Sequence, residues 1–308
     1  MNNDLAPITL FVYNRPWHTE QTLLALQEND LASQSILYIF ADGAKKDATA
    51  EQLEAVAEVK NLIKSKKWCG EVHIIEQTEN KGLADSIIDG VTEVVNKYGK
   101  IIVLEDDLVT SKGFLKYMND ALSLYSGEES IAGISGYSFN YDSKGYPTTY
   151  LLPIGSSWGW ATWAGQWEIF NPDASKLKRE VEEQSLSKKM DFGYYPYSDM
   201  LDRQERGEVN SWAIRFYVSF FLKNMLFLFP NKSLVQNLGF DNSGENCEEG
   251  DNTIFDRRSN MTDYHELPKQ KTILQKDVVK QLEKEFIVKF KKPSILTRIV
   301  RSIKRKLN

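Results

Sequence analysis

The segment Ile101-Ile-Val-Leu-Glu-Asp-Asp107 places three consecutive carboxylates directly after four apolar residues. A short apolar run of this kind is typical of a buried strand. Adjacent carboxylates at the end of a strand repel one another, and their pKa values rise unless a cation binds nearby. The segment therefore predicts a strand that delivers acidic side chains to a cation site, and a solvated acidic turn is the alternative.

Three more apolar runs precede this segment, and stretches with helical periodicity separate them. The runs cover residues 8–13, 36–40 and 72–75, and the helical stretches cover residues 19–27, 50–64 and 83–97. Strands that alternate with helices indicate βαβ units in a doubly wound, mostly parallel α/β sheet. In such sheets, ligands bind at the carboxyl ends of the strands.

Polar residues follow three of the predicted strands at these ends. Asn14 and Arg15 follow the first strand, and Arg15 would pair with a phosphate group. Asp42 follows the second strand, where it would contact a nucleobase or ribose, and Lys81 precedes the third helix, where it would lie near a phosphate. A surface arginine, a simple turn and a helix start are the structural alternatives for these residues.

The second half of the chain has a different pattern. We expect strands at 131–139, 149–153, 227–230 and 234–236, a helix at 212–223 and a polar mobile loop at 241–263. Residues 156–163 predict an aromatic loop, in which Trp158 and Trp160 would form a wall for stacking sugars; core packing is the alternative. The predicted organisation is a nucleotide-binding part (1–130), an acceptor-binding and catalytic part of the same domain (131–275) and a C-terminal tail (276–308).

The composition limits the class of protein. The chain has 308 residues, 42% of them apolar, and a net charge of −5. Residues 289–308 contain eight lysines and arginines and no acidic residue, so the rest of the chain is strongly acidic and is not expected to bind nucleic acid. We find no pattern of a signal peptide or a transmembrane helix, and two cysteines form no disulfide framework. Apolar and basic residues alternate after Pro293 at helical spacing, which favours an amphipathic helix on an anionic membrane over a docked or disordered end.

Several motifs, taken in order, resemble those of a known family. They are Asn14-Arg-Pro16, Ala41-Asp-Gly43, Glu79-Asn-Lys-Gly-Leu-Ala84, Glu105-Asp-Asp-Leu108, Trp158-Gly-Trp-Ala-Thr-Trp163, Ser211-Trp-Ala-Ile-Arg215 and Asn237-Leu-Gly-Phe-Asp241. Together they look like the GT-A fold glycosyltransferases, in particular bacterial sugar transferases of capsule and lipopolysaccharide pathways that are related to N-acetylglucosaminyltransferase I. The resemblance covers residues 8–247.

The resemblance implies a Rossmann-like GT-A sheet and a role for each matching residue. Asp107 would bind Mn²⁺ or Mg²⁺, while Asp106 and Glu105 would face ribose and sugar hydroxyls. Asp42 would contact the nucleobase, and Lys81 would lie along the donor diphosphate or sugar. The later motifs would contribute an acceptor wall, formed by Trp158, Trp160, Trp212 and Arg215.

An inverting transfer needs a carboxylate base near the acceptor hydroxyl. The resemblance implies an Asp directly before Ser211, but this chain has Asn210 there, so Glu208, Asp202 and Asp199 are the candidate bases. A second departure is Asn246, which stands where the family pattern has a His before the Cys.

The resulting hypothesis is a metal-dependent inverting glycosyltransferase of surface polysaccharide synthesis. It would use a UDP-linked sugar donor and a glycan or lipid-linked acceptor. We expect it in the cytoplasm, held peripherally on the inner face of the plasma membrane by the tail. The first alternative is a degenerate GT-A domain that binds a glycan or nucleotide-sugar as a scaffold. The second is a nucleotidyltransferase, which the missing Gly-rich basic loop near the N-terminus disfavours.

Overall fold

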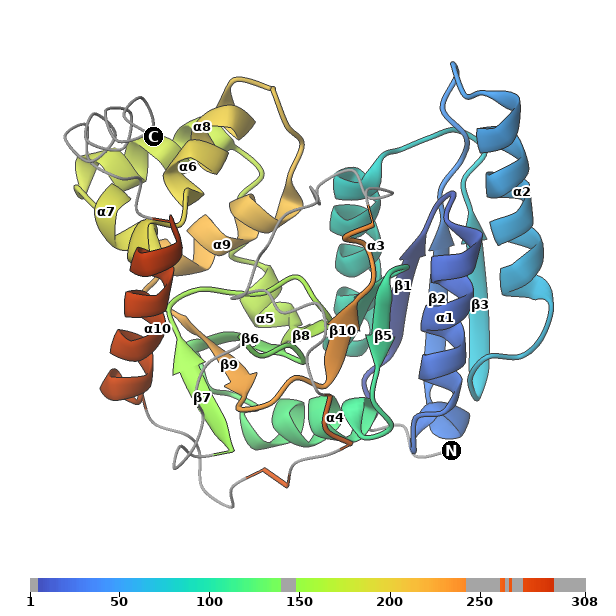
Figure 1. Cartoon of the computed structure of the whole chain (residues 1–308), viewed down its shortest axis with the longest axis horizontal. Coiled ribbons are helices and arrows are strands. Elements are labelled where there is room, and N and C mark those ends of the chain that lie inside the picture. The colour runs from blue at the N-terminus through green and yellow to red at the C-terminus, as the bar shows by residue number, and fades with distance from the viewer. Residues whose placement is uncertain (1–4, 140–147, 242–260, 264–265, 268–273, 291–308) are drawn as a thin grey trace, which may run out of the picture.

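The computed structural model describes residues 5–139, 148–241, 261–263, 266–267 and 274–290 (Figure 1). Its centre is an eight-stranded sheet with the strand order β3-β2-β1-β4-β8-β6-β9-β7, and a second sheet pairs β10 with β5. The strands are β1 (Ile8–Val12), β2 (Ile36–Ala41), β3 (Glu71–Glu76), β4 (Lys100–Glu105), β5 (Leu108–Thr110), β6 (Ile131–Ser135), β7 (Thr149–Leu152), β8 (Trp160–Trp163), β9 (Leu226–Pro230) and β10 (Val235–Asn237). The helices are α1 (Pro16–Gln27), η1 (Ala32–Gln34), α2 (Ala50–Lys64), α3 (Leu83–Tyr98), α4 (Phe114–Leu124), α5 (Ala164–Trp167), α6 (Ala174–Glu183), α7 (Ser187–Met190), η2 (Phe192–Tyr194), α8 (Tyr197–Glu205), α9 (Trp212–Leu222) and α10 (Lys276–Phe290).

The predicted α/β class is confirmed, and the first four predicted strands lie side by side. β1 pairs in parallel with both β2 and β4, and β2 pairs in parallel with β3. Their carboxyl ends therefore meet at one edge of the sheet. Local hydrogen bonds also fix where a connecting helix starts: before α2, Thr49 and Gln52 form a reciprocal capping box.

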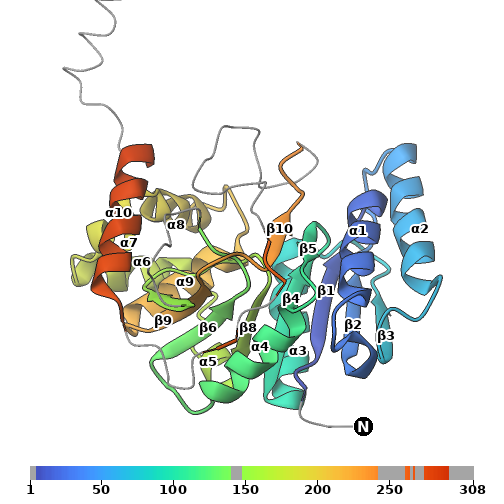
Figure 2. The same ribbon diagram turned by 60° about the horizontal axis from the view of Figure 1, so that its bottom comes forward.

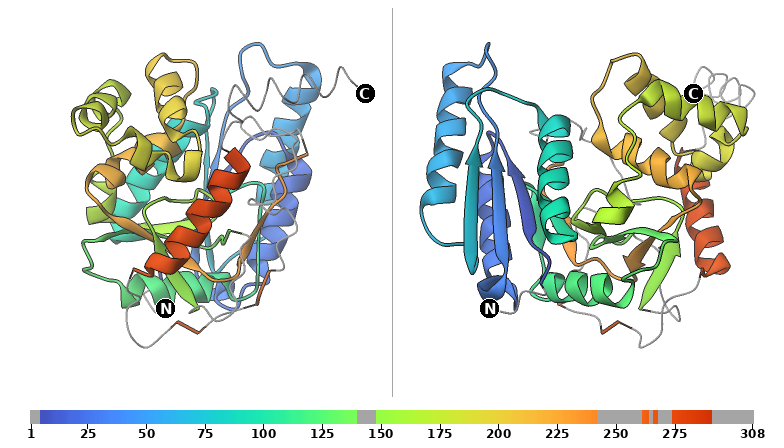
Figure 3. Two further views of the ribbon diagram at one scale, coloured as in Figure 1. Left: turned by 60° about the vertical axis from the view of Figure 1, so that its left-hand side comes forward. Right: turned by 180° about the vertical axis from the view of Figure 1, so that it is seen from behind.

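Alternate side chains of these strands enter two separate hydrophobic cores, one on each face of the sheet. Phe11 and Phe40 stack at 5.1 Å and pack on the face covered by α3. Leu10 and Ile39 point to the opposite face, where they join Leu23 of α1. Figure 3 shows α1 and α3 on opposite sides of the sheet. Because both faces are covered, β1, β2 and β4 are buried along most of their length and lack the alternation of a half-exposed strand, whereas the edge strand β3 is only partly buried.

One sequence prediction is wrong in this region. Residues 160–163 do not belong to an aromatic loop but form β8, which lies antiparallel between β4 and β6, with Ala161 opposite Ile102 and Ile134. Every residue of β8 is buried. A four-residue strand that is buried on both faces has no alternating pattern, and the Gly and Ser residues before it resemble a loop.

The C-terminal helix α10 packs against the rest of the domain. Phe286 is fully buried and lies 5.4 Å from both Phe192 and Phe139, between ring centres. Figure 2 shows α10 beside α7. The first part of the segment predicted as a basic tail is therefore a docked helix, and the amphipathic stretch after Pro293 lies outside the described residues. Among the helices described, none is long and apolar enough to cross a membrane.

Candidate active site

The acidic segment lies where β4 ends and the small β5–β10 sheet begins. Glu105 is the last residue of β4, and Leu108 starts β5. The N–H of Leu238 donates to the carbonyl of Asp107 over 2.8 Å. Gly239 then lies directly against the Asp107 carboxylate, where any Cβ would collide with it. The segment after β10 thus covers Asp107 closely, and any side chain at position 239 would force the Asp107 carboxylate to move.

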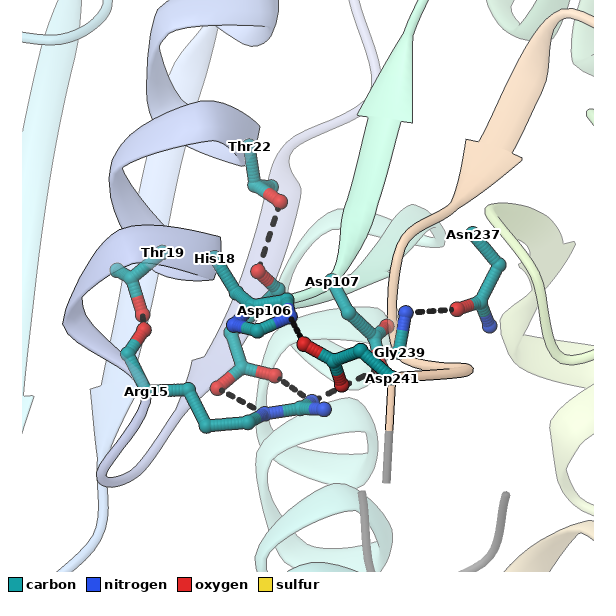
Figure 4. Close-up of polar contacts among 9 residues, drawn as sticks. All are labelled: Arg15, His18, Thr19, Thr22, Asp106, Asp107, Asn237, Gly239 and Asp241. Atoms are coloured by element: carbon teal, nitrogen blue, oxygen red, sulfur yellow. Dashed lines mark hydrogen bonds and ion pairs between the residues drawn. The ribbon is translucent and has the colours of Figure 1, made fainter. Parts of the chain in front are cut away.

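Arg15, which follows β1, binds two of the three carboxylates (Figure 4). Its Nη2 donates to Asp106 and also to Asp107 Oδ2, the latter at 2.9 Å, and its Nε lies 3.3 Å from Asp106 Oδ2. The three side chains are only 16%, 7% and 10% exposed, so this charge pairing is shielded from water. Burial alone would lower the pKa of Arg15, but the two carboxylates raise it above its ordinary value. Arg15 therefore stays charged.

One guanidinium does not neutralise three carboxylates. Burial, together with Asp107 and Asp106, raises the pKa of Glu105 to about 8, although Arg15 opposes this shift. Burial likewise raises the pKa of Asp106 against the effect of Arg15. Near neutral pH, Glu105 therefore keeps its proton, and a bound divalent cation would stabilise the ionised form of the carboxylates in its place.

Two residues of α1 support the cluster. Thr22 donates its hydroxyl to the carbonyl of Asp106 over 2.8 Å. His18 Nε2 lies 3.0 Å from Asp241 Oδ2, beyond β10 (Figure 4). The first two turns of α1 are thereby tied both to the acidic segment and to the chain after β10.

Asp42 accepts hydrogen bonds from the loop that precedes α3. Its Oδ1 accepts the N–H groups of Gly43 and Lys81, both at 2.8 Å. Its Oδ2 accepts from Gly82 N–H at 2.9 Å and from Asn80 Nδ2 at 3.0 Å. Both oxygens are thus engaged by the loop that starts α3, so Asp42 shapes this loop and any nucleobase contact would have to share these oxygens.

The other predicted donor residues lie around the same sheet edge. The ammonium group of Lys81 pairs with Asp89 of α3, and the structure gives it no ion pair with the acidic cluster within the described residues. Asn14 is half-buried between β1 and α1. A small cavity beside Asp42 runs along the start of α3 and is lined by Gln77, Lys81, Ser86 and Asp89, among others.

The predicted aromatic wall is only partly at the surface. Trp160 is 1% exposed and stacks on Trp212 at 5.1 Å, so the prediction that it stacks on a sugar is wrong. Trp212, at 5% exposed, belongs to the same core. Both rings fill the space between β8 and α9. The glycines and serines before Trp160 are typical of a loop, so the sequence pattern did not indicate burial. Trp158 is half-buried against Tyr137 and Phe240.

A polar chain of three residues joins α9 to the start of α3. Buried Arg215 donates from Nη2 to Asn210 Oδ1 over 2.7 Å, and from Nε to the Ser211 carbonyl over 3.0 Å. Asn210 Nδ2 lies 3.4 Å from Asp85 Oδ1. Asp85 is a carboxylate that the sequence analysis missed, because 125 residues separate it from Asn210. Its position directly after the Glu79–Ala84 motif, in the first turn of α3, is the only signal in the sequence.

The three predicted bases lie on α8 or just after it. Two of them, Glu208 and Asp202, pair with a basic side chain. Glu208 accepts from Arg206 Nε and Nη2, and these bonds lower its pKa. Asp202 pairs with Lys178 at 3.0 Å. Asp199 is exposed on the first turn of α8. In the described part of the chain, no hydrogen bond or ion pair connects them with the acidic cluster.

A divalent metal fits the acidic cluster only if a ligand supplies further oxygens. Within the described ranges, no group of three or more His, Cys, Asp or Glu side chains is arranged to hold a metal by itself. Asp107, with Asp106, offers one or two carboxylates at the end of β4. This set suits a metal such as Mg²⁺ or Mn²⁺ that is completed by substrate phosphates and water.

Comparison with known proteins gives one family match. Residues 8–183 match the model of the family described as glycosyl transferase family 2. No curated protein sequence matches the chain at a significant level.

Solved structures show weak likenesses at low sequence identity. A mannosyltransferase from Pyrobaculum calidifontis in complex with GDP-Man and Mn²⁺ is 12% identical, with 59% of this chain and 49% of that chain covered and a TM-score of 0.31. A UDP-glucose pyrophosphorylase complexed with UDP-glucose is 11% identical, with 74% and 91% covered and a TM-score of 0.37. TarS residues 1–349 from S. aureus is 11% identical, with 75% and 59% covered and a TM-score of 0.39. This chain thus spans about half the length of the mannosyltransferase.

The assignment rests on the sequence match, which covers more than half of the chain and includes β1 to β4, the acidic segment and β8. The protein therefore belongs to glycosyl transferase family 2.

Proposed function

We propose that the protein transfers a sugar from a nucleotide-sugar donor, UDP-linked, to a glycan or lipid-linked acceptor of surface polysaccharide synthesis, with inversion at the anomeric carbon. The observation that carries this proposal is the cluster of three acidic side chains at the carboxyl end of β4, of which Arg15 contacts only Asp106 and Asp107. A divalent cation would supply positive charge to this cluster, and a diphosphate would supply the further oxygen ligands that the cation needs.

In this proposal, Asp107 holds the metal together with phosphate oxygens of the donor. When bound, the metal neutralises charge that develops on the departing diphosphate. Glu105 and Asp106 face the donor. The loop from Asn80 to Gly82, which Asp42 holds by hydrogen bonds and which includes Lys81, lies beside the donor. Trp158 is the remaining ring of the predicted acceptor wall that is partly exposed, and buried Arg215 positions Asn210 instead of contacting a sugar.

Removal of metal tests the proposal directly. Release of nucleoside diphosphate would be measured with UDP-glucose, UDP-N-acetylglucosamine and GDP-mannose as donors. We expect turnover of one of these with Mn²⁺ or Mg²⁺, a loss of turnover with excess EDTA and recovery when metal is restored. Turnover that continues in EDTA would contradict the role of the metal.

Asp85 is an additional candidate for the base that receives the acceptor proton. It borders Asn210 at the start of α9, and the described structure gives it no lysine or arginine within ion-pair distance, unlike Glu208 and Asp202. In an inverting step, the acceptor oxygen attacks the anomeric carbon, its proton passes to the carboxylate, and the bond from that carbon to the diphosphate breaks. A base of this kind contributes about 10²–10⁴-fold to the rate.

Replacement of Asp85 by asparagine should therefore lower kcat by about 10²–10⁴-fold, while donor affinity stays near that of the wild type. The measurement is nucleoside diphosphate release, together with titration of the donor. Asp277→Asn is the matched control, because Asp277 also lies in the first turn of a helix, α10. A kcat for Asp85→Asn within threefold of the wild type would exclude Asp85 as the base and return the role to Asp199, Asp202 or Glu208.

A second candidate function is a scaffold that binds a nucleotide-sugar or glycan without turnover. The observation that favours it is that Asn210, which cannot act as a base, is held by Arg215 where the family resemblance implies a carboxylate. A wild-type protein that binds a donor with Mn²⁺ but never releases nucleoside diphosphate would support the scaffold.

The predicted attachment of the tail to an anionic membrane, on the inner face of the plasma membrane, stays a prediction.

A further inference from the structure

Arg15 lies in the position that a metal cation would need. Its Nη2 is shared between Asp106 and Asp107, and its Nε adds a further contact with Asp106 (Figure 4). Gly239 closes the other side of the Asp107 carboxylate. A divalent cation at Asp107 would therefore compete with the guanidinium for Oδ2, since two cations cannot share that oxygen at close range without repulsion.

The remaining nitrogen of this guanidinium has no partner. Nη1 is buried, and no acceptor within the described residues lies within hydrogen-bond distance of it. A buried donor without an acceptor is destabilising, and an added oxygen ligand would remove that cost. Arginine also binds phosphate groups through two parallel N–H donors. Nη1 of Arg15 can therefore donate to an anionic oxygen, which the described residues do not provide.

The backbone of Arg15 is held while its side chain can change partners. Its carbonyl accepts from Thr19 twice, from N–H at 3.0 Å and from Oγ1 at 2.8 Å. The side chain extends from this fixed point at the start of α1 to the carboxylates. A change of partner therefore needs only side-chain rotation, without movement of β1 or α1.

We propose that Arg15 is a positioning residue that exchanges partners and makes metal and diphosphate bind cooperatively. Without metal, it neutralises Asp107. Metal alone binds weakly, because it must displace a guanidinium that then has too few partners in a shielded site. When a diphosphate is also present, Arg15 moves to the phosphate oxygens, and the metal takes Asp107. The proposal rests on the proposed function, specifically on a metal at Asp107.

The test measures Mn²⁺ binding, not turnover. Free Mn²⁺ would be followed by electron paramagnetic resonance in titrations of the wild type and Arg15→Met, each alone and with saturating UDP or GDP. In the wild type, we expect nucleotide to tighten Mn²⁺ binding at least about tenfold, within the range usual for coupled sites. In Arg15→Met, Mn²⁺ alone should bind about tenfold more tightly than in the wild type, and nucleotide should add less than about threefold.

The controls separate this proposal from general changes in charge or folding. Arg206→Met removes the same charge from an exposed pair with Glu208 and should leave Mn²⁺ binding unchanged. Circular dichroism melting establishes that Arg15→Met is folded, and Arg15→Gln replaces it if it is not. A crystal structure of the wild type with Mn²⁺ and UDP should show Arg15 on the diphosphate and not on Asp107.

Two kinds of failure can be told apart. Equal affinity of the wild type and the Arg15 variants for Mn²⁺ alone, or tightest binding by the wild type, would overturn the exchange while leaving the metal site intact. If the double variant Arg15→Met, Asp107→Asn still binds Mn²⁺ as Arg15→Met does, then the metal lies elsewhere, and the metal site of the proposed function is wrong together with the role of Arg15.

Discussion

Asp107→Ala should lower turnover by at least about 10²–10³-fold, the usual cost of removing a group that stabilises charge in the transition state. The change removes the proposed metal ligand at the end of β4. It removes no core volume, and it relieves repulsion among three carboxylates, of which Glu105 has its pKa raised to about 8 in part by Asp107. The melting temperature should therefore stay within a few degrees of the wild type.

The measurement pairs nucleoside diphosphate release at saturating Mn²⁺ with a melting curve. Asp120→Ala serves as the control, because Asp120 lies on α4 and pairs with Lys116 on the surface. Near-wild-type turnover of Asp107→Ala at saturating Mn²⁺ would refute the assignment of Asp107 as the metal ligand. A large fall in the melting temperature would instead mean that the carboxylate stabilises the fold.

Trp160→Ala should lower the free energy of unfolding by about 3–5 kcal/mol, the usual range for truncating a buried Trp. Trp160 is the first residue of β8, and its ring contacts Trp212, Trp167 and Phe216 at centroid distances between 5.1 and 5.8 Å. Removing the ring would leave a cavity between the sheet and α9 that the surrounding aromatic rings fill only in part. Chemical denaturation would measure the loss.

Two further variants sharpen this test. Trp17→Ala deletes the same side chain at a place where it is 57% exposed, so its unfolding free energy should change little. Trp160→Phe keeps a ring and removes an indole N–H that has no acceptor within the described residues, so it should cost much less than alanine. If Trp160→Ala leaves stability unchanged but weakens donor or acceptor binding, the core role described above is wrong.

Local sequence patterns predicted much of the first half of the fold. The runs that became β1, β2 and β4 are apolar because both faces of the sheet are covered there, and the helices between them keep their own periodicity. The acidic segment was recognisable for the same reason: three charged residues directly after a buried strand need a cation or solvent. Asp107, Asp106 and Arg15 were therefore found as candidates before their contacts were known.

The second half was harder to interpret, because its signals are not local. β8 is only four residues long and lies in the middle of a sheet, where burial on both faces removes any alternation. Trp160 consequently looked like a surface ring. Its burial depends on Trp212 and on β4, which lie more than 50 residues away on either side and which no local pattern connects with it.

The sequence by itself determined the α/β class, the alternation of strands and helices in the first half and the residues that stand at the carboxyl ends of those strands, because strand and helix periodicity and the cost of adjacent charges act over a few residues. Only the tertiary structure decided how those residues are partnered. It engaged both oxygens of Asp42 with the loop before α3, placed Arg15 between Asp106 and Asp107, and brought Asp85 to Asn210 across 125 residues. Pairings of this kind arise from packing between distant segments, so they follow from the arrangement of the whole sheet and its helices and not from the spacing of residues along the chain.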